Sequence, residues 1–269
     1  MKVTEVSCKS ALSKSGLGYD YALNPYRGCE HGCTYCYAPA VLRETRPWGQ
    51  FVDIKRNIPS ILAKELRRRM KGHVGIGTVT DAYQPVEQRY EVTRRCLEQL
   101  LRFDFPISIQ TKSSLVLRDL DLLKQFSQVD VGVTITSYDD NLRQVFEPRA
   151  ASVSERLVTL EQLSAHGIAT WLFLGPILPS ITDKNLEDLI KAAMKSGVQE
   201  IIIDKLRLKA GIWKRMVHGL KQTNPELIKV FRRTLWSNNP YFTIVGDEIK
   251  HLCNNYRIRC QVAFEHAQG

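Results

Sequence analysis

The chain has 269 residues, of which 43% are hydrophobic, and its formal net charge is +10 at pH 7. This length and apolar content suffice for one large hydrophobic core, so we expect a single domain over residues 1–269. No apolar run reaches the roughly 18 to 20 residues of a membrane span, and the N-terminal "MKVTEVSCKSALSKSG" lacks the apolar core of a secretory signal. We therefore expect a cytoplasmic protein with no membrane partner. The positive charge favours partners that carry phosphates.

Short β-branched runs alternate with amphipathic stretches over the first three-quarters of the chain. The predicted strands lie near residues 19–23 and in "VGIGTVT" (from Val74), "PISIQTK" (from Pro106), "VDVGVTIT" (from Val129), "IATWLFLGPI" (from Ile168) and "VQEIIID" (from Val198). The predicted helices lie near residues 58–70, 87–103, 119–126, 152–166 and 183–195. This order favours parallel strands with right-handed crossovers. It predicts an α/β fold, a partial (βα)6 TIM-like barrel over residues 19–204 with a helical C-terminal extension over 205–269.

Polar side chains follow several of these predicted strands. The set is Thr80, Asp81, Thr111, Lys112, Thr136, Asp204 and Lys205. Because the carboxyl ends of parallel strands meet at one rim, where loops of varied sequence converge, we expect these side chains to surround a functional site.

Three of the seven cysteines are crowded into "NPYRGCEHGCTYCYAPA", which begins at Asn24. In a reducing compartment such crowding indicates metal rather than disulfides. A closed zinc site would need His31 as the fourth ligand beside Cys29, Cys33 and Cys36, at a poor spacing for a tetrahedral site, and this alternative stays open. The spacing C-x3-C-x2-C suits a 4Fe-4S cluster in which one iron is left open for another ligand.

This cysteine motif, with Tyr35 before the last cysteine and with Gly28 and Gly32 in the loop, resembles that of the radical S-adenosylmethionine (SAM) enzymes. The stretches "TVTDAYQPVEQRYEVTR", "ISIQTKSSLVLRDLDLL", "EPRAASVSERL" and "GPILPSITD" resemble the spore photoproduct lyase-like branch, also called DNA repair photolyases. The resemblance covers roughly residues 21–204 and implies a barrel of the radical SAM type.

The resemblance implies that Cys29, Cys33 and Cys36 hold a 4Fe-4S cluster whose open iron binds SAM. It further implies that a low-potential donor such as ferredoxin or flavodoxin reduces the cluster. The carbon-sulfur bond of SAM then breaks to give a 5'-deoxyadenosyl radical, which abstracts hydrogen from a substrate. The cofactors carry this chemistry, and the protein supplies orientation and excludes water.

The same resemblance implies roles for single side chains. Thr80, Lys112 and Thr136 match positions that hold the methionine portion of SAM, with Lys112 suited to its carboxylate, and Tyr35 matches the residue that packs against the adenine. A purely structural role is the alternative for each. The two threonines could simply end strands, Lys112 could be a solvated lysine, and Tyr35 could be ordinary packing.

Two further candidates follow from their neighbours. Arg149 in "EPRA" either forms a salt bridge with Glu147 or reaches the cofactor carboxylate. Asp81 either caps the next helix or pairs with the amino group of SAM.

One departure concerns the source of hydrogen. The lyases carry a hydrogen-donating cysteine directly before the position matched by Thr80, and Val79 stands there in this chain. We expect Cys96, Cys253 and Cys260 to be buried small hydrophobic residues that do not replace it. We therefore do not expect a spore photoproduct lyase proper. Hydrogen would return from 5'-deoxyadenosine or from a tyrosine such as Tyr37, or not at all if the reaction is not a repair.

The C-terminal third mixes aromatic and basic residues. Trp213, Trp236, Tyr241 and Phe242 lie among lysines and arginines, a pattern typical of stacking platforms for bases and also of amphipathic packing. Three functions stay open. They are a radical enzyme acting on DNA or RNA, a radical enzyme acting on a peptide or small metabolite, and a noncatalytic metal or nucleic-acid binding module.

Overall fold

Seven parallel strands form the main sheet of the computed structural model, which describes residues 1–236 and 239–263. The sheet order is β11-β10-β9-β8-β7-β6-β3, with the antiparallel β2 (Leu12–Ser13) paired to β3 at the far edge. The parallel strands are β3 (Tyr21–Leu23), β6 (Val74–Ile76), β7 (Ile107–Thr111), β8 (Val129–Thr134), β9 (Ala169–Ile177), β10 (Glu200–Lys205) and β11 (Arg259–Val262). Because β11 and β2 lie at opposite edges, the sheet is an open, partial barrel.

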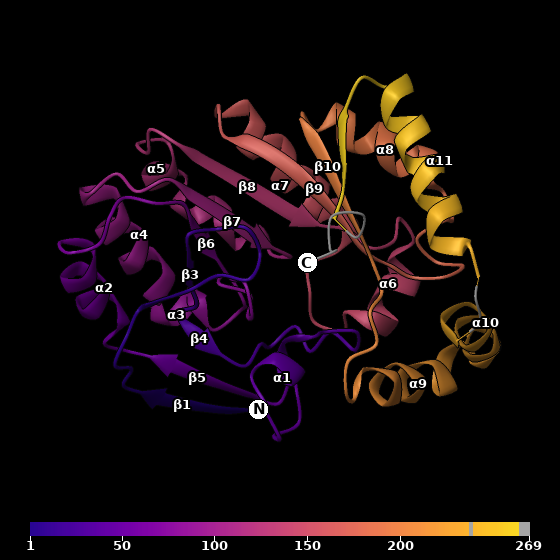
Figure 1. Cartoon of the computed structure of the whole chain (residues 1–269), viewed down its shortest axis with the longest axis horizontal. Coiled ribbons are helices and arrows are strands. Elements are labelled where there is room, and N and C mark those ends of the chain that lie inside the picture. The colour runs from indigo at the N-terminus through magenta and orange to yellow at the C-terminus, as the bar shows by residue number, and fades with distance from the viewer. Residues whose placement is uncertain (237–238, 264–269) are drawn as a thin grey trace.

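Helices connect these strands and cover the outer face of the curved sheet (Figure 1). They are α1 (Ala38–Val41), α2 (Ile58–Leu66), α3 (Glu87–Tyr90), α4 (Val92–Arg102), η1 (Ser114–Asp119), α5 (Leu120–Leu123), α6 (Asp140–Phe146), α7 (Val153–Ala165), α8 (Leu186–Lys195), α9 (Ile212–Thr223), α10 (Pro225–Trp236) and α11 (Tyr241–Asn255). The predicted α/β class and the alternation of strands and helices are confirmed. No described helix is both long and apolar enough to cross a membrane.

Local sequence explains several of these elements. The start of α7 carries a capping box, in which the Ser152 hydroxyl accepts from the Glu155 amide and the Glu155 carboxylate accepts from the Ser152 amide. In β8, Gly132 lies opposite Trp171 of β9, and a Cβ at that position would come within 2.2 Å of the indole. The indole N–H of Trp171 donates to Asp130 at 2.6 Å, which fixes the ring across the strand pair.

Two features of the fold were not predicted. A second sheet, of order β1-β5-β4, is built from β1 (Lys2–Val6), β5 (Phe51–Lys55) and β4 (Tyr26–Arg27), and it leads directly into the cysteine segment. The C-terminal extension contains the predicted helices, but it ends in β11, which adds to the main sheet beside β10. The extension is mostly helical, as predicted, and β11 is the element that was not predicted. The short β11 has no apolar run that would indicate a strand, because it is only partly buried.

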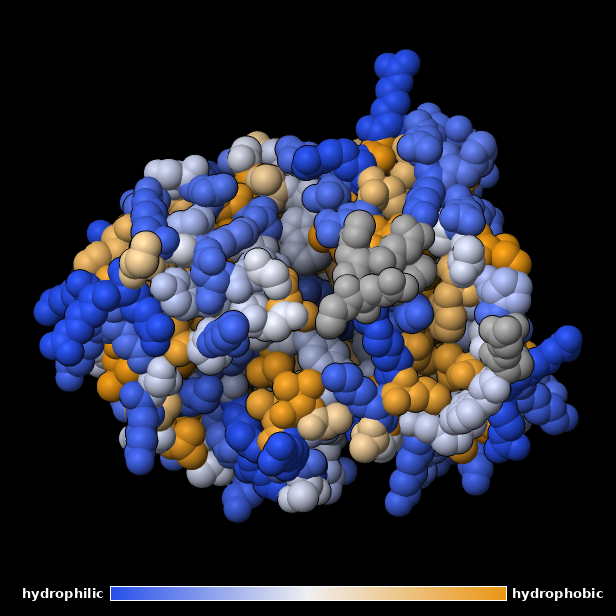
Figure 2. Space-filling model, in the orientation of Figure 1, coloured by the Kyte–Doolittle hydropathy of each residue, from blue (hydrophilic) through white to orange (hydrophobic). Residues whose placement is uncertain are grey.

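The core consists of three groups of buried side chains. One lies between β3, β6 and β7 and the helices α2 and α4, and a second lies between β8, β9 and β10 and the helices α8 and α11. The third joins Cys33 and Tyr35 to Phe146 of α6, Met216 of α9 and Phe231 of α10. The extension thus packs against the cysteine segment itself. Figure 2, in the orientation of Figure 1, shows exposed hydrophobic residues in the middle of this face of the molecule, near α1 and beside α6 and α9.

Candidate active site

The loop from Gly28 to Tyr37, between β4 and α1, carries the three crowded cysteines (the cysteine loop). Cys29 and Cys33 are buried, Cys36 is half-buried, and all three are free thiols. Gly28 has φ = +89°, and a Cβ there would lie 2.4 Å from the carbonyl oxygen of Phe51. Only glycine allows the loop to approach β5 this closely.

The three thiols lie within electrostatic range of one another. Burial raises the pKa of each thiol, that of Cys33 to about 12, and the neighbouring sulfurs raise the pKa of Cys29 further. Within the described ranges, no three His, Cys, Asp or Glu side chains converge closely enough to ligate one ion. A 4Fe-4S cubane takes each thiolate on a separate iron, so its ligands need not converge on one point. The donor set therefore suits a cluster better than a single zinc ion.

His31 does not complete a zinc site, because both of its ring nitrogens have other partners. Nδ1 lies 3.1 Å from the carbonyl oxygen of Arg149, and Nε2 lies 3.0 Å from Oδ2 of Asp81. The zinc alternative is therefore not supported. His31 instead connects the cysteine loop to the loops that carry Asp81 and Arg149.

Asp81 is the centre of a buried set of hydrogen bonds at the end of β6. Besides His31, its carboxylate accepts from the Thr111 hydroxyl at 2.8 Å and from the backbone amides of Lys112 at 2.8 Å and Tyr83 at 2.9 Å. Burial works to raise the pKa of Asp81, but His31 and Lys112 outweigh it and hold the pKa well below its usual value. Both carboxylate oxygens of Asp81 thus have protein partners, and its predicted contact with the amino group of SAM stays a prediction.

Thr80 connects the same rim loop to the start of the cysteine loop. Its hydroxyl donates to the Gly28 carbonyl oxygen at 2.6 Å and accepts from Nε2 of Gln84 at 3.0 Å. The predicted contact of Thr80 with SAM stays a prediction, and the hydroxyl proton already has a protein acceptor.

Lys112 directly follows β7 and projects its ammonium toward the cysteine loop. Nζ lies 5.9 Å from the ring centroid of Tyr35, and within the described part of the chain no hydrogen-bond acceptor is paired with it. Burial works to lower the pKa of Lys112, but Cys33, Glu147 and Asp81 raise it overall, so the side chain is a cation. This ammonium at the rim is available to an anionic ligand.

Glu147 is fully buried behind Tyr35 and pairs with Arg156 of α7. It accepts hydrogen bonds from the Tyr35 hydroxyl and, at 3.1 Å, from the Thr136 hydroxyl. Burial works to raise the pKa of Glu147, but Arg156 and Lys112 lower it overall. The predicted cofactor roles of Tyr35 and Thr136 stay predictions, with both hydroxyls directed at this carboxylate.

Arg149 does not pair with Glu147, so that alternative was wrong. Its guanidinium donates to the Gly49 carbonyl oxygen and lies against Gly32, while Arg156 occupies the carboxylate of Glu147. Arg149 is exposed, and its reach to a cofactor carboxylate stays a prediction.

Tyr37 lies at the end of the cysteine loop and is 38% exposed. Its hydroxyl donates to the Thr78 carbonyl oxygen at 2.5 Å, one residue before Val79. Burial, with Cys36 and Asp204, raises the pKa of Tyr37, so the phenol stays protonated. The tyrosine is therefore at the rim, and its role as a hydrogen source stays a prediction.

Two functional contacts were missed in the sequence. Arg215 of α9 donates to the carbonyl oxygens of Cys36 at 2.6 Å and Thr34 at 3.2 Å, which joins the C-terminal extension to the cysteine loop. The second missed contact is the ion pair of Arg156 with Glu147, and the sequence contains a signal for it. Arg156 lies three residues after Val153 and four before Leu160 on the buried stripe of α7, where a charged residue requires a partner.

The comparisons with known proteins agree with this geometry. Residues 23–193 match the family model described as the radical SAM superfamily. An uncharacterized protein of Methanocaldococcus jannaschii is 31% identical over 252 residues, which cover 93% of this chain and 92% of that protein. A radical SAM Nalpha-GlyT isomerase of Pseudomonas phage M6 is 24% identical over 213 residues, covering 77% of this chain and 44% of that protein.

Among solved structures, a spore photoproduct lyase with bound AdoMet and dinucleoside spore photoproduct matches with a TM-score of 0.76. The match covers 97% of this chain and 81% of the lyase at 14% sequence identity. Such a likeness shows the fold alone.

Proposed function

Because this chain belongs to the radical SAM superfamily, whose members use a 4Fe-4S cluster and SAM, we propose that it generates a 5'-deoxyadenosyl radical and directs it at a nucleic acid. The chain is an enzyme of this superfamily, and the cluster ligands and the substrate class are what we add. One observation carries the proposal: three free thiols, two buried and one half-buried, lie on one loop beside the Lys112 ammonium.

We assign Cys29, Cys33 and Cys36 as the cluster ligands. When bound, the cluster supplies an electron from a low-potential donor to SAM, whose carbon-sulfur bond breaks. His31, within the loop that carries the cysteines, bonds to Asp81, and Arg215 bonds to the second half of that loop, so both hold it in place. The Lys112 ammonium would bind the carboxylate of SAM before cleavage, because it is a cation at the rim with no paired protein acceptor among the described residues.

A nucleic acid is the substrate class that the charge favours. The net charge of +10 raises the local concentration of polyanions, and basic residues continue from the rim into α9 and α10. The fold likeness to a lyase solved with a dinucleoside spore photoproduct agrees with this choice. Val79 separates this chain from the lyase pattern, so we propose a DNA or RNA reaction other than spore photoproduct cleavage.

The cluster assignment is tested by anaerobic reconstitution of the wild type, Cys33→Ala and Cys8→Ser. Cys8 is a half-buried thiol outside the cysteine loop and is the matched control. We expect Cys33→Ala to lose cluster-bound iron and SAM cleavage, and Cys8→Ser to keep both. Full iron content and SAM cleavage in Cys33→Ala would overturn the cluster assignment. If only a peptide or small metabolite stimulates SAM cleavage, that class would replace nucleic acid as the proposed substrate.

A further inference from the structure

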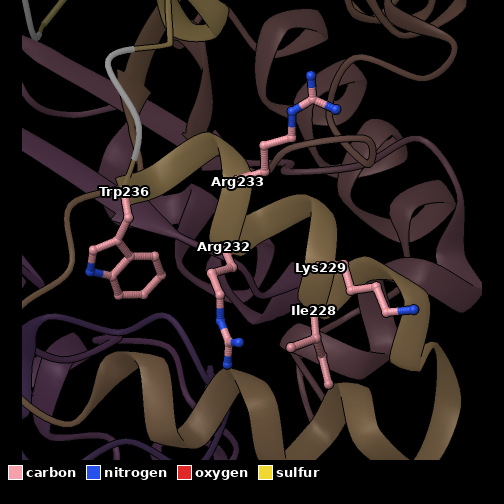
Figure 3. Close-up of a pocket in the computed structure, with 5 residues that line it drawn as sticks. All are labelled: Ile228, Lys229, Arg232, Arg233 and Trp236. Atoms are coloured by element: carbon pink, nitrogen blue, oxygen red, sulfur yellow. The ribbon is translucent and has the colours of Figure 1, made fainter.

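One hollow on the C-terminal extension combines positive charge with an exposed aromatic ring. It has a volume of about 380 Å³ and is lined by Ile228, Lys229, Arg232, Arg233 and Trp236, all from α10. Figure 3 shows Ile228, Arg232 and Trp236 along one side of the helix, with Arg232 and Trp236 projecting side by side. We call this surface the α10 hollow.

The side chains that line the α10 hollow are mostly basic. Three of its five lining residues are cationic and none is acidic. Lys229 has an exposed partner, Glu226, at 3.5 Å, whereas Arg232 is exposed and has no ion pair within the described residues. Exposed ion pairs are weak, so Glu226 offsets little of the positive charge at the hollow.

Trp236 gives the hollow an apolar platform. It is 57% exposed, although a tryptophan gains much from burial. Its ring lies 4.7 Å from that of Trp213 in α9, at an angle of 76°, so an edge contact supports the ring. The other two aromatic residues of the predicted platform, Tyr241 and Phe242, are half-buried and pack into the core.

Packing and hydrogen bonds through α9 connect α10 to the cysteine loop. Phe231 of α10 packs with Met216 of α9 in the same group of buried side chains as Cys33 and Tyr35. On α9, Arg215 donates to the carbonyl oxygens of Cys36 and Thr34. A ligand held on α10 is therefore held by the element that packs on the candidate active site.

We propose that the α10 hollow binds a single-stranded segment of the nucleic-acid substrate, with a phosphate on Arg232 and an unpaired base stacked on Trp236. This assignment rests on the proposed function and specifies where its substrate is held. Arginine suits phosphate because its guanidinium offers several fixed donors, and an aromatic face accepts any base. The charge argues against an apolar or cationic peptide as the occupant.

A second basic hollow provides a matched control. It is lined by Lys9, Ile61, Lys64, Glu65, Arg68 and Arg69, with a volume of about 420 Å³, and it has a carboxylate and no aromatic ring. Figure 1 places its helix α2 at the opposite end of the molecule from α10. Lys64 and Arg68 are exposed, as Arg232 is, so Lys64→Ala and Arg68→Ala remove equivalent charges elsewhere.

The test is the binding of a labelled oligo(dT) to the reconstituted full chain, measured by fluorescence anisotropy over a range of salt concentrations. We expect Trp236→Ala to weaken binding by about 5- to 100-fold and Trp236→Phe to restore most of it. Arg232→Ala should reduce the slope of log affinity against log salt by about 0.7. Lys64→Ala and Arg68→Ala should bind oligo(dT) as the wild type does.

Equal losses in the α10 variants and in Lys64→Ala and Arg68→Ala would overturn the assignment, because they would indicate that binding depends on charge alone. Arg232-dependent binding of poly-glutamate without binding of oligo(dT) would overturn it in favour of an acidic peptide. Cleavage of SAM by the wild type without nucleic acid is measured separately. Absence of SAM cleavage both with and without nucleic acid would be a failure of the proposed function, whereas cleavage together with equal binding losses would be a failure of the hollow alone.

Discussion

His31 and Asp81, fifty residues apart in sequence, meet at 3.0 Å and join the cysteine loop to the rim of the sheet. Both side chains are buried. The other ring nitrogen of His31 lies 3.1 Å from the Arg149 carbonyl oxygen, so one side chain connects three loops. The position of the cysteine loop therefore depends on residues that are not themselves proposed ligands.

Removal of the Asp81 carboxylate should destabilise the protein strongly. Asp81→Ala leaves His31, Thr111 and two backbone amides without their acceptor, which we expect to cost about 3–5 kcal/mol in the free energy of unfolding. Asp121→Ala, which removes a carboxylate that is 57% exposed and paired with Arg94, should cost only about 0–1 kcal/mol. Anaerobic denaturant titration measures both, and similar losses would contradict a central role for Asp81.

Lys112→Met should separate SAM binding from cluster assembly. Loss of a charged contact to the SAM carboxylate should weaken SAM binding by about 10- to 100-fold, while the iron content stays that of the wild type. Lys195→Met removes an exposed lysine at the last position of α8, away from the rim, and is the control. Equilibrium dialysis with labelled SAM measures the affinity, and wild-type affinity in Lys112→Met would rule out this contact.

Gly28→Ala and Gly18→Ala separate backbone strain from steric conflict. Both glycines have positive φ, +89° and +82°, and alanine there costs about 1–2 kcal/mol. At Gly18 the new Cβ meets nothing within 4 Å, whereas at Gly28 it meets the Phe51 backbone. We expect Gly28→Ala to lose a further ~1–3 kcal/mol in unfolding free energy, and cluster-bound iron with it. Equal stability of the two variants would show that the loop tolerates the extra atom.

Glu65 should make part of the stability depend on pH. Burial works to raise its pKa, but the amides of Ala11 and Leu12 and the Ser10 hydroxyl outweigh it and lower the pKa below the ordinary 4.5. A depressed folded-state pKa gives stability that is present above pH 4.5 and is lost as the pH falls through the folded value. The stability difference between wild type and Glu65→Gln should therefore shrink on acidification.

The control for this pH dependence is Glu161→Gln, an exposed position on α7, which should change stability by no more than about 0.5 kcal/mol. Thermal unfolding of both variants over a pH series measures the effect. A Glu65→Gln difference that is constant with pH would contradict the role given to these hydrogen bonds.

Periodicity and residue type were enough to predict the parallel strands and the connecting helices. The capping box at Ser152 and the β-branched runs of β7 and β8 are local signals, and local signals determine local structure. The strand β11 and the small sheet were missed because their pairing depends on partners distant in sequence, such as Ile201 for Cys260.

The site was predictable to a similar extent. The crowding of the three cysteines is visible in the sequence, and so is the position of Lys112 after a strand. The choice of Arg156 rather than Arg149 as the partner of Glu147 is not visible, because it depends on which side chain the fold turns inward. The hydrogen bonds from Arg215 to the cysteine loop are likewise not visible in the sequence, because they join residues about 180 positions apart.

The central claim is that this chain cleaves SAM and directs the radical at a nucleic acid. The most direct test reduces the reconstituted wild type anaerobically and follows 5'-deoxyadenosine from SAM alone, with UV-irradiated DNA and with bulk RNA. We predict 5'-deoxyadenosine in all three reactions, formed faster with at least one of the nucleic acids. No 5'-deoxyadenosine from fully reconstituted, reduced protein under any of the three conditions would contradict the account, and equal rates under all three would contradict a nucleic-acid substrate.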